Sequence, residues 1–297
     1  MFSFKKRNLD KLKKFIRKSD NKLSNEDREG IIQLIRPSIG ISTKKLSSDN
    51  LKIGKSKIGG KPDMPENIDW PTLNNSPLIF CAQYNVAEMK KYDTENLLPK
   101  EGMFYIFLGI NEEWNGFSID ENVSKIFFIE NLENLERKEY PESLNEDNKI
   151  DPAEIVYFER LTLPDDENYK LLYFNEKYED FYFYFYQETD EFLTENLYEP
   201  FDSMHQILGE DRSIQSSVVY DFAKNELNIK NDEEHVEKWN DIFEYSKSYK
   251  LLIQLDCMDS NTNLNKFGGT GVFYIGLKEE ELKKMKFDNL RISYQST

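Results

Sequence analysis

The sequence predicts an α+β fold of two related halves built on duplicated, mainly antiparallel sheet units, with peripheral helices and an N-terminal helical extension. Two observations carry this prediction. A set of three strand-like segments occurs twice in the same order, and a strongly basic segment precedes the first set. A content of 38% hydrophobic residues, with 17 tyrosines and 21 phenylalanines, is enough to form a core.

Each set begins with an apolar strand that carries a glutamine near its end. LIFCAQYNV (78–86) and YKLLIQLDC (249–257) align, and two residues after each glutamine there is a second polar residue. Residues two apart on a strand lie on one face, so each strand places two polar side chains together among apolar neighbours. The aligned residues are Gln83 with Gln254 and Asn85 with Asp256.

A glycine-led aromatic strand and then a third strand follow in both sets. They are GMFYIFLG from Gly102 with VSKIFFIE (123–130), and GVFYIGL from Gly271 with NLRISYQ (289–295). Three features in the same order are better explained by a duplicated half-domain than by chance. We therefore divide the chain into an N-terminal part, 1–36, and a single α+β domain, 37–297, with halves of about 53–150 and 151–297.

The N-terminal part is expected to be helical. Residues 5–18, KKRNLDKLKKFIRK, hold eight basic residues and one acidic residue, and their apolar residues recur at helical spacing. Such a helix can lie on anionic lipid or dock on the acidic body of its own protein. We favour docking because the apolar stripe is short, and we leave membrane contact open. A second helix is expected to begin at the N-cap Ser24 and to end at Pro37.

The segment from Ser56 to Gln83 organises the first half. Gly59 and Gly60 permit backbone conformations that are closed to other residues. Four of the ten prolines follow, so we expect no regular structure between Lys61 and Ser76. Trp70 in this stiff loop is expected either to cover the core or to form one wall of a cleft.

Between the two sets, the pattern predicts one strand and several helices. Ala153 to Leu163 is predicted to be a strand. Tyr178 to Gln187 fits a strand by its alternating aromatic residues and a helix by its i, i+3, i+4, i+7 stripe, and the flanking Glu and Gln favour the helix. Further helices are expected at about 217–228, 232–246 and 279–285.

The composition limits the partners and the compartment. The formal net charge of −16 repels nucleic-acid phosphates, so we expect no nucleic-acid partner, and a basic protein or peptide stays a candidate. Cys81 and Cys257 are too few for a disulfide framework or a zinc site, and we expect both in the core of a protein from a reducing compartment. Because no apolar segment is long enough to span a membrane and no signal peptide is evident, we expect a cytoplasmic location.

Several motifs together resemble the YwqG-like family of bacterial proteins of unknown function. They are SKIGGKPDMP, the DWP of 69–71, PLIFCAQ and LLPKEGMFYIF in the first half, and HQILGE, LLIQLD and FGGTGVFYI in the second. The resemblance covers roughly residues 37 to 297. It implies a compact α+β fold with two related halves and carries over no catalytic residues. DRSIQ stands where the family has a proline-containing turn, so this turn is expected to differ.

Three segments carry groups that could support chemistry. GKSKIGGK (54–61) lacks the spacing of a phosphate-binding loop, so we favour a tight turn on the core over an anion site with Ser56 and Lys57. DCMDSNTNLNKFGG (256–269) lacks the glycine and glutamate of a calcium loop, so we favour a polar surface loop. For His205 we favour packing with a hydrogen bond over catalysis. We therefore expect no catalytic residue, cofactor or metal site.

The two glutamine strands are the sharpest candidates for a site. If they lie side by side, Gln83, Asn85, Gln254 and Asp256 converge and either line a cleft or anchor a hydrogen-bonded core network, and we favour the network. Our first hypothesis is a cytoplasmic, non-catalytic binding or protein-interaction module, which includes an immunity-like neutraliser of a cationic protein. The alternative is a hydrolase or transferase with Gln83, Asp256 and His205 in a cleft between the halves.

Overall fold

The computed structural model describes residues 2–19, 22–111, 116–117, 123–196 and 203–297. Its main sheet contains β1 (Arg36–Lys45), β2 (Lys57–Ile58), β6 (Ile79–Asn85), β7 (Met103–Leu108), β10 (Lys125–Ile129), β12 (Ala153–Thr162), β13 (Gln206–Ile207), β14 (Tyr249–Asp256), β15 (Val272–Lys278) and β16 (Arg291–Gln295). Three two-stranded pieces pair β3 (Asp63–Pro65) with β11 (Leu135–Arg137), β4 (Thr72–Leu73) with β5 (Ser76–Pro77), and β8 (Ile110–Asn111) with β9 (Gly116–Phe117).

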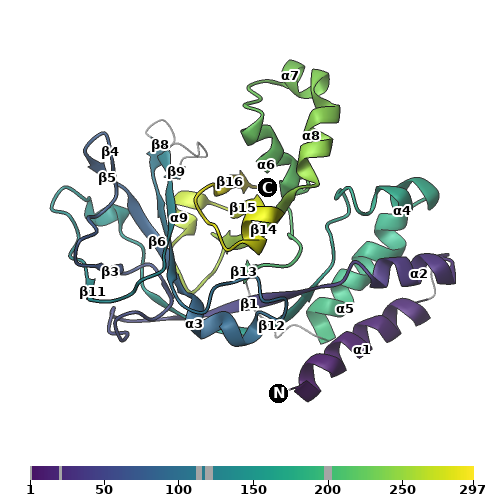
Figure 1. The fold of residues 1–297 in the computed structure, drawn as a ribbon, viewed down its shortest axis with the longest axis horizontal. Coiled ribbons are helices and arrows are strands. Elements are labelled where there is room, and N and C mark those ends of the chain that lie inside the picture. Colours follow the sequence, from purple (N-terminus) through teal and green to yellow (C-terminus); the bar gives the residue numbers. More distant parts are fainter. Residues whose placement is uncertain (1, 20–21, 112–115, 118–122, 197–202) are drawn as a thin grey trace.

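Most helices lie on one side of this sheet, and the predicted α+β class is confirmed (Figure 1). They are α1 (Phe2–Lys18), α2 (Asn25–Ile32), α3 (Val86–Met89), α4 (Leu172–Lys177), α5 (Glu188–Asn196), α6 (Val218–Glu226), α7 (Asp232–Glu237), α8 (Trp239–Ser246), α9 (Asn265–Gly268) and α10 (Glu279–Lys283), with the 3₁₀ turns η1 (Lys90–Tyr92) and η3 (Glu146–Asn148) and the π-helix η4 (Tyr182–Gln187). Residues 182–187 are thus helical, as we favoured, and α6, α7, α8 and α10 confirm the three further helices.

The strand order of the main sheet has the same plan from both ends. The order is β10-β7-β6-β2-β12-β1-β13-β14-β15-β16, and every neighbouring pair is antiparallel. From each end, a three-stranded meander leads to a two-residue strand and then to the long central pair of β12 and β1. Both meanders contain a register shift just before the glutamine, at Phe80/Ala82 and at Leu251/Ile253. These features agree with the expected duplication, which stays a prediction.

The sheet curls so that its two ends share one hydrophobic core. Residues of β6 and β7 lie in the same buried cluster as residues of β14 and β15. The Phe117 ring contacts the Phe273 ring edge-on at 5.6 Å. Cys81 and Cys257 are buried in this core as free thiols. The curl therefore leaves each glutamine strand with the shared core on one face and a second apolar cluster on the other face.

The outer face of the first half is covered by a separate apolar cluster that includes Trp70 at its edge. The indole meets the Phe107 ring edge-on at 5.5 Å and donates its Nε1–H to the carbonyl of Leu78 at 2.8 Å. Trp70 was expected either to cover the core or to form a cleft wall. The structure places it over this apolar cluster.

Helices α1, α2, α4 and α5 form a group beside the sheet (Figure 1). The α1 residues Leu12 and Ile16 are fully buried in a cluster with residues of α2 and α5, and the Phe15 ring stacks on Phe192 at 4.2 Å. The apolar side of the basic helix thus packs on the protein itself. None of the helices in the described ranges is long and apolar enough to cross a membrane.

Two expectations about prolines are wrong. Helix α2 ends at Ile32, and Pro37 lies inside β1, opposite Leu161. The segment from Lys61 to Ser76 also contains the short strands β3 and β4. Proline is tolerated where its nitrogen is not needed for the ladder, which is the case at the end of a short strand such as β3.

The packing of α1 predicts that Leu12→Ala destabilises the folded protein. Removal of a fully buried leucine side chain leaves a cavity, so the free energy of unfolding should fall by about 2–5 kcal/mol. Urea unfolding of both variants would measure this, with the exposed neighbour substitution Lys11→Ala as the control. Equal effects of the two substitutions would contradict the docked position of α1.

Candidate functional site

Two turns occupy matching positions in the two halves of the sheet. The first glycine turn comprises residues 57–63, and the second comprises residues 206–212. Each leaves a two-residue strand and passes through two residues with positive φ, which are Gly59 and Gly60 in the first turn and Leu208 and Gly209 in the second. Side chains crowd both outer glycines, since a Cβ added at Gly60 or Gly209 would lie within 2.7 Å of a neighbour.

A buried glutamine and a buried tyrosine hold each turn against the sheet. In the first half, Gln83 Oε1 accepts from Asp63 N at 2.8 Å, and the Tyr105 hydroxyl donates to Asp63 O at 2.6 Å. In the second half, Gln254 Oε1 accepts from Arg212 N at 3.2 Å, and the Tyr274 hydroxyl donates to Arg212 O at 2.8 Å. We call each arrangement a clamp. The two clamps have the same geometry and fix the turns at residues 63 and 212.

The first glycine turn is closed by charged side chains that satisfy one another. The Lys57 ammonium is fully buried and donates to both Asp49 oxygens at 3.0 and 3.1 Å and to the carbonyl of Lys61. The Asp63 carboxylate accepts from Arg137 Nε at 2.8 Å and from Gln83 Nε2 at 3.0 Å. Burial lowers the pKa of the Lys57 amine, and the carboxylates of Asp63 and Asp49 oppose this effect. Each of these charged groups is therefore bound by the turn or by its neighbours.

Ser56 and Asn85 complete the same network. The buried Ser56 hydroxyl accepts from Asn85 N at 2.8 Å and from the Tyr157 hydroxyl at 2.9 Å. The Asn85 amide donates to the carbonyl of Gly54 at 2.7 Å, and its oxygen caps α3 by accepting from Ala87 N at 3.0 Å. Residues 54–61 are thus not one tight turn: they contain a turn at Gly54, the strand β2 and a second turn at Gly59 and Gly60.

His205 and Asp256 lie in a second buried network. His205 Nδ1 accepts from Asp256 N at 2.9 Å, and Nε2 lies 3.1 Å from Asp259 Oδ2. The Asp256 carboxylate accepts from Met204 N and Met258 N, both at 2.8 Å. The expectation of a polar surface loop is wrong for Asp256 and Asp259, which are buried because their oxygens hold the backbone of this loop. Both His205 ring nitrogens are occupied, and the ring is fully buried.

The two glutamine strands do not lie side by side. In the sheet, β2, β12, β1 and β13 separate β6 from β14. Gln83 and Gln254 each serve their own clamp, so the four polar groups form two separate networks. The condition for a shared polar cleft is thus not met.

The second glycine turn leaves two donors without acceptors that are paired in the first turn. Gly60 N donates to the carbonyl of Ile150 at 2.9 Å, whereas the N–H of Gly209 has no acceptor among the described residues. Gln83 Nε2 has two acceptors, the carbonyl of Lys55 and Asp63 Oδ2, whereas Gln254 Nε2 is buried without one in the described part of the chain. One part of the difference follows from the sequence, because the Asp63 carboxylate accepts from Gln83 Nε2 and the arginine at position 212 has no acceptor to offer.

A cleft of about 310 Å³ opens beside the second turn. We call it the Gly209 cleft. Four leucines give it an apolar surface, and charged side chains from β1, β14 and α10 surround them. It is lined by Arg36, Glu95, Leu97, Leu208, Gly209, Glu210, Lys250, Leu251, Glu279, Leu282 and Lys283.

Three basic and three acidic side chains line the Gly209 cleft, and they are unevenly paired. Lys283 pairs with Glu279 at 2.7 Å, and Glu210 is bound by Lys170 at 2.6 Å. Lys250 lies 3.7 Å from Glu279. Arg36 forms no ion pair within the described residues, but its Nη1 donates to the carbonyls of Gln33 and Ile35 at 2.8 and 3.0 Å. Burial lowers the pKa of the Lys250 amine, the positive charges of Lys170 and Arg36 lower it further, and the carboxylates of Glu210 and Glu279 oppose this effect. A negative charge in the cleft would relieve this repulsion.

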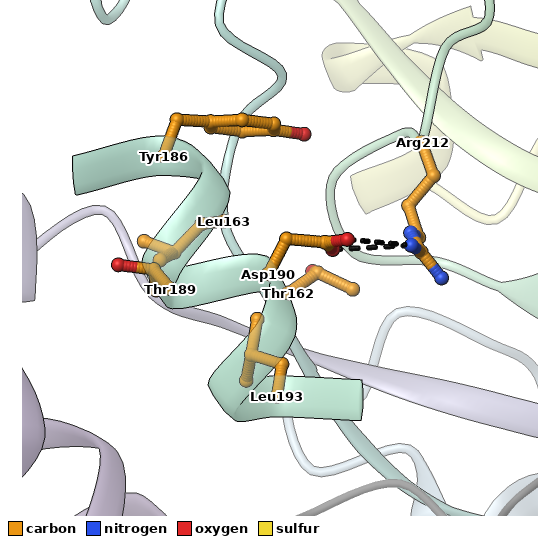
Figure 2. A pocket seen from close by; sticks show the side chains of 7 residues that line it. All are labelled: Thr162, Leu163, Tyr186, Thr189, Asp190, Leu193 and Arg212. Carbon is orange, nitrogen blue, oxygen red and sulfur yellow. Dashed lines mark hydrogen bonds and ion pairs between the residues drawn. The ribbon is translucent and has the colours of Figure 1, made fainter. Parts of the chain in front are cut away.

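A smaller cavity of about 20 Å³ lies on the other side of the second turn (Figure 2). Asp190 of α5 and Arg212 of the turn form an ion pair beside it at 3.1 Å, and Tyr186 and Leu193 lie at opposite ends of the view. The buried Thr189 hydroxyl has no hydrogen-bond partner in the described chain. This volume holds about one water molecule, so the cavity is too small for an organic ligand.

The residues that line the Gly209 cleft were not singled out from the sequence. Arg36, Gly209 and Lys250 look like ordinary residues at the ends of strands. The available signal is the likeness of Ile207-Leu208-Gly209 to Ile58-Gly59-Gly60, which is short and is displaced from the second glutamine by helices α6 to α8. Among the described residues, no group of three or more His, Cys, Asp and Glu side chains is placed to hold a metal ion.

The unequal clamps predict unequal losses of stability when the glutamines are replaced. Gln83→Met leaves Asp63 N and the carbonyl of Lys55 without partners and should lower the free energy of unfolding by about 3 kcal/mol. Gln254→Met removes one such bond and should lower it by about 1–2 kcal/mol. Urea unfolding of the two variants gives the comparison. A larger loss at Gln254 would show that its amide has a partner.

Asp165 predicts a pH dependence of stability. Burial and the negative charge of Asp211 raise the pKa of the Asp165 carboxyl from 3.8 to about 8. Between these values the folded protein holds a proton that the unfolded chain has lost, so this group lowers stability as the pH rises. Asp165→Asn should therefore gain stability relative to the unaltered protein between about pH 5 and about pH 8.5, measured by urea unfolding. A difference independent of pH would contradict the raised pKa.

A search of curated proteins returned no match to this chain. A family model, described as a domain of unknown function (DUF1963), matches residues 56–296. The match begins at the first glycine turn and includes both clamps and the second turn. It leaves out α1, α2 and β1, although β1 lies in the centre of the sheet. Since the matched residues make up most of the sequence, the chain belongs to the DUF1963 family.

Proposed function

We propose that this protein is a non-catalytic binding module that takes up a small ligand in the Gly209 cleft. One observation carries the proposal, which is the contrast between the two glycine turns. The first turn is closed by Asp49, Lys57 and Arg137, whereas the second borders an open cleft of about 310 Å³. In the second half, Thr162 and Gln206 bind the N–H and the carbonyl of Glu210, and the turn still borders the cleft at Gly209.

The Gly209 cleft has the character of a small-molecule site. Its volume lies at the lower end of the range found for ligand pockets. Leucine side chains offer apolar contact, and a few charged groups provide orientation. The elements that contribute them, β1, β14 and α10, are packed on the main core, which favours a preformed site.

The alternative, a hydrolase or transferase that uses Gln83, Asp256 and His205, has less support. Each of these side chains is buried and holds backbone groups of its own network. None of them lines the Gly209 cleft. A catalytic group has to reach its substrate, so we favour binding over catalysis.

The finer classification is also proposed. The motifs around both turns support membership of the YwqG-like group within the wider family, and the matched clamps and strand order support an internal duplication. The absence of a disulfide between the two buried cysteines agrees with a cytoplasmic location. A partnership with a basic protein or peptide, as in an immunity-like role, rests on the net charge of −16.

A thermal-shift screen of the full chain against metabolites and basic peptides tests the proposed function. Binding to the folded state alone raises the melting temperature, so a ligand of the Gly209 cleft should stabilise the unaltered protein. Leu97→Trp, which adds bulk at the half-buried edge of the cleft, should abolish this shift. Leu227→Trp, at a half-buried position outside the cleft, is the matched control and should keep it.

Two results would overturn the proposal. One is a shift caused by basic peptides and by no small molecule, which would favour the protein-interaction module. The other is a small-molecule shift that Leu97→Trp leaves unchanged, which would place the ligand elsewhere.

A further inference from the structure

We propose that the Gly209 cleft binds a small organic acid, whose carboxylate is held by the Gly209 N–H, the Lys250 ammonium and the Arg36 guanidinium. The inference rests on the proposed function, because it names the ligand class of the same site. It comes from a comparison of the two halves.

The first half contains a carboxylate seated on its glycine turn. Asp49 Oδ2 accepts from Lys61 N at 2.7 Å and from Lys57 Nζ at 3.0 Å. Arg137 adds a guanidinium at 3.4 Å from Asp49 Oδ1. One turn N–H, one lysine and one arginine therefore neutralise a single carboxylate.

The second half offers the same three kinds of donor around a cleft. Gly209 lines the cleft, and its N–H has no acceptor among the described residues. Lys250 and Arg36 line it as well, from the beginnings of strands β14 and β1. The position that Asp49 occupies in the first half is taken here by Thr162, whose hydroxyl accepts from Glu210 N at 2.8 Å. Thr162 thus satisfies the N–H of Glu210, and the donors that remain are those that line the cleft, namely Gly209, Lys250 and Arg36.

The charges around the cleft favour an anion. Glu210 and Glu279 are already bound by Lys170 and Lys283 at 2.6 and 2.7 Å. Lys250 is left with a long contact of 3.7 Å to Glu279. Arg36 has the exposed Glu95 at the rim and uses its Nη1 for the carbonyls of Gln33 and Ile35, so its other nitrogens remain for a ligand. Acidic residues outnumber basic ones by 55 to 39 in this chain, yet two incompletely paired cations meet in this cleft. A carboxylate would be bound by charge-assisted hydrogen bonds in a partly desolvated site.

The apolar side chains of the cleft indicate the chemical character of the rest of the ligand. Leu208, Leu251 and Leu282 are buried, and Leu97 is half-buried at the edge. These side chains cannot hydrogen-bond a polar body, so they select a hydrocarbon chain or ring over a second charged group. The ligand class is thus a monocarboxylic acid with a short apolar chain.

Calorimetric titration of the full chain with pairs of acids and their amides tests this inference. The probes are butanoate, hexanoate and phenylacetate, each with its uncharged amide, together with inorganic phosphate. At least one acid should bind more tightly than its amide. Lys250→Met, which keeps the aliphatic stem, should weaken acid binding by about tenfold or more, since it removes a charged hydrogen bond.

Matched variants separate a charge effect from a loss of folding. Lys250→Arg should retain much of the acid affinity, and Lys247→Met, which removes a lysine outside the cleft, should leave it unchanged. If every amide binds as tightly as its acid, or phosphate alone binds, the carboxylate assignment is wrong. A neutral ligand that Leu97→Trp displaces would then leave the proposed function standing, whereas the absence of any ligand sensitive to Leu97→Trp would remove both.

Discussion

The hydrogen bonds of two buried glutamine and tyrosine pairs are the interactions on which the arrangement of this protein depends. Each pair binds the N–H and the carbonyl of a single residue, Asp63 or Arg212. A turn that leaves a sheet and crosses its face buries backbone groups that cannot pair within the ladder, and an unpaired buried group costs about 1–3 kcal/mol. The clamps supply the missing partners, so the turns can lie on the sheet without water.

The same clamp is compatible with opposite charges around it. In the first half the clamped residue is Asp63, which pairs with Arg137 of β11. In the second half it is Arg212, which pairs with Asp190 of α5. The partner therefore comes from a loop-borne strand in one half and from the helical group in the other. Because the ion-pair partner comes from a different element in each half, the first turn is enclosed, whereas the second turn keeps one side open to the Gly209 cleft.

Much of the fold could be predicted from the sequence, because strand and helix patterns are local. Alternation and aromatic content mark all six repeated strands, and periodicity marks α1, α6 and α10. The order of the strands in the sheet was less accessible, since the two-residue strands β2 and β13 have no pattern of their own, although they separate the glutamine strands from the centre. The helical form of residues 182–187 was only weakly indicated, because a run of aromatic residues fits both periodicities.

The candidate site was less predictable than the fold, and the reason is physical. A polar residue such as Gln83 stands out in a sequence because its neighbours are apolar, and this is also the pattern of a buried group that is satisfied by hydrogen bonds. A cleft is different: its charged residues are partly exposed, lie at the ends of elements and come from distant segments. Arg36, Gly209 and Lys250 are brought together by the pairing of β1, β13 and β14 and by nothing in their local sequence. In a fold with two matching halves, the more informative signal is therefore a difference between equivalent positions. The proposed ligand site rests on such a difference, because the N–H of Gly60 has an acceptor and that of Gly209 has none among the described residues.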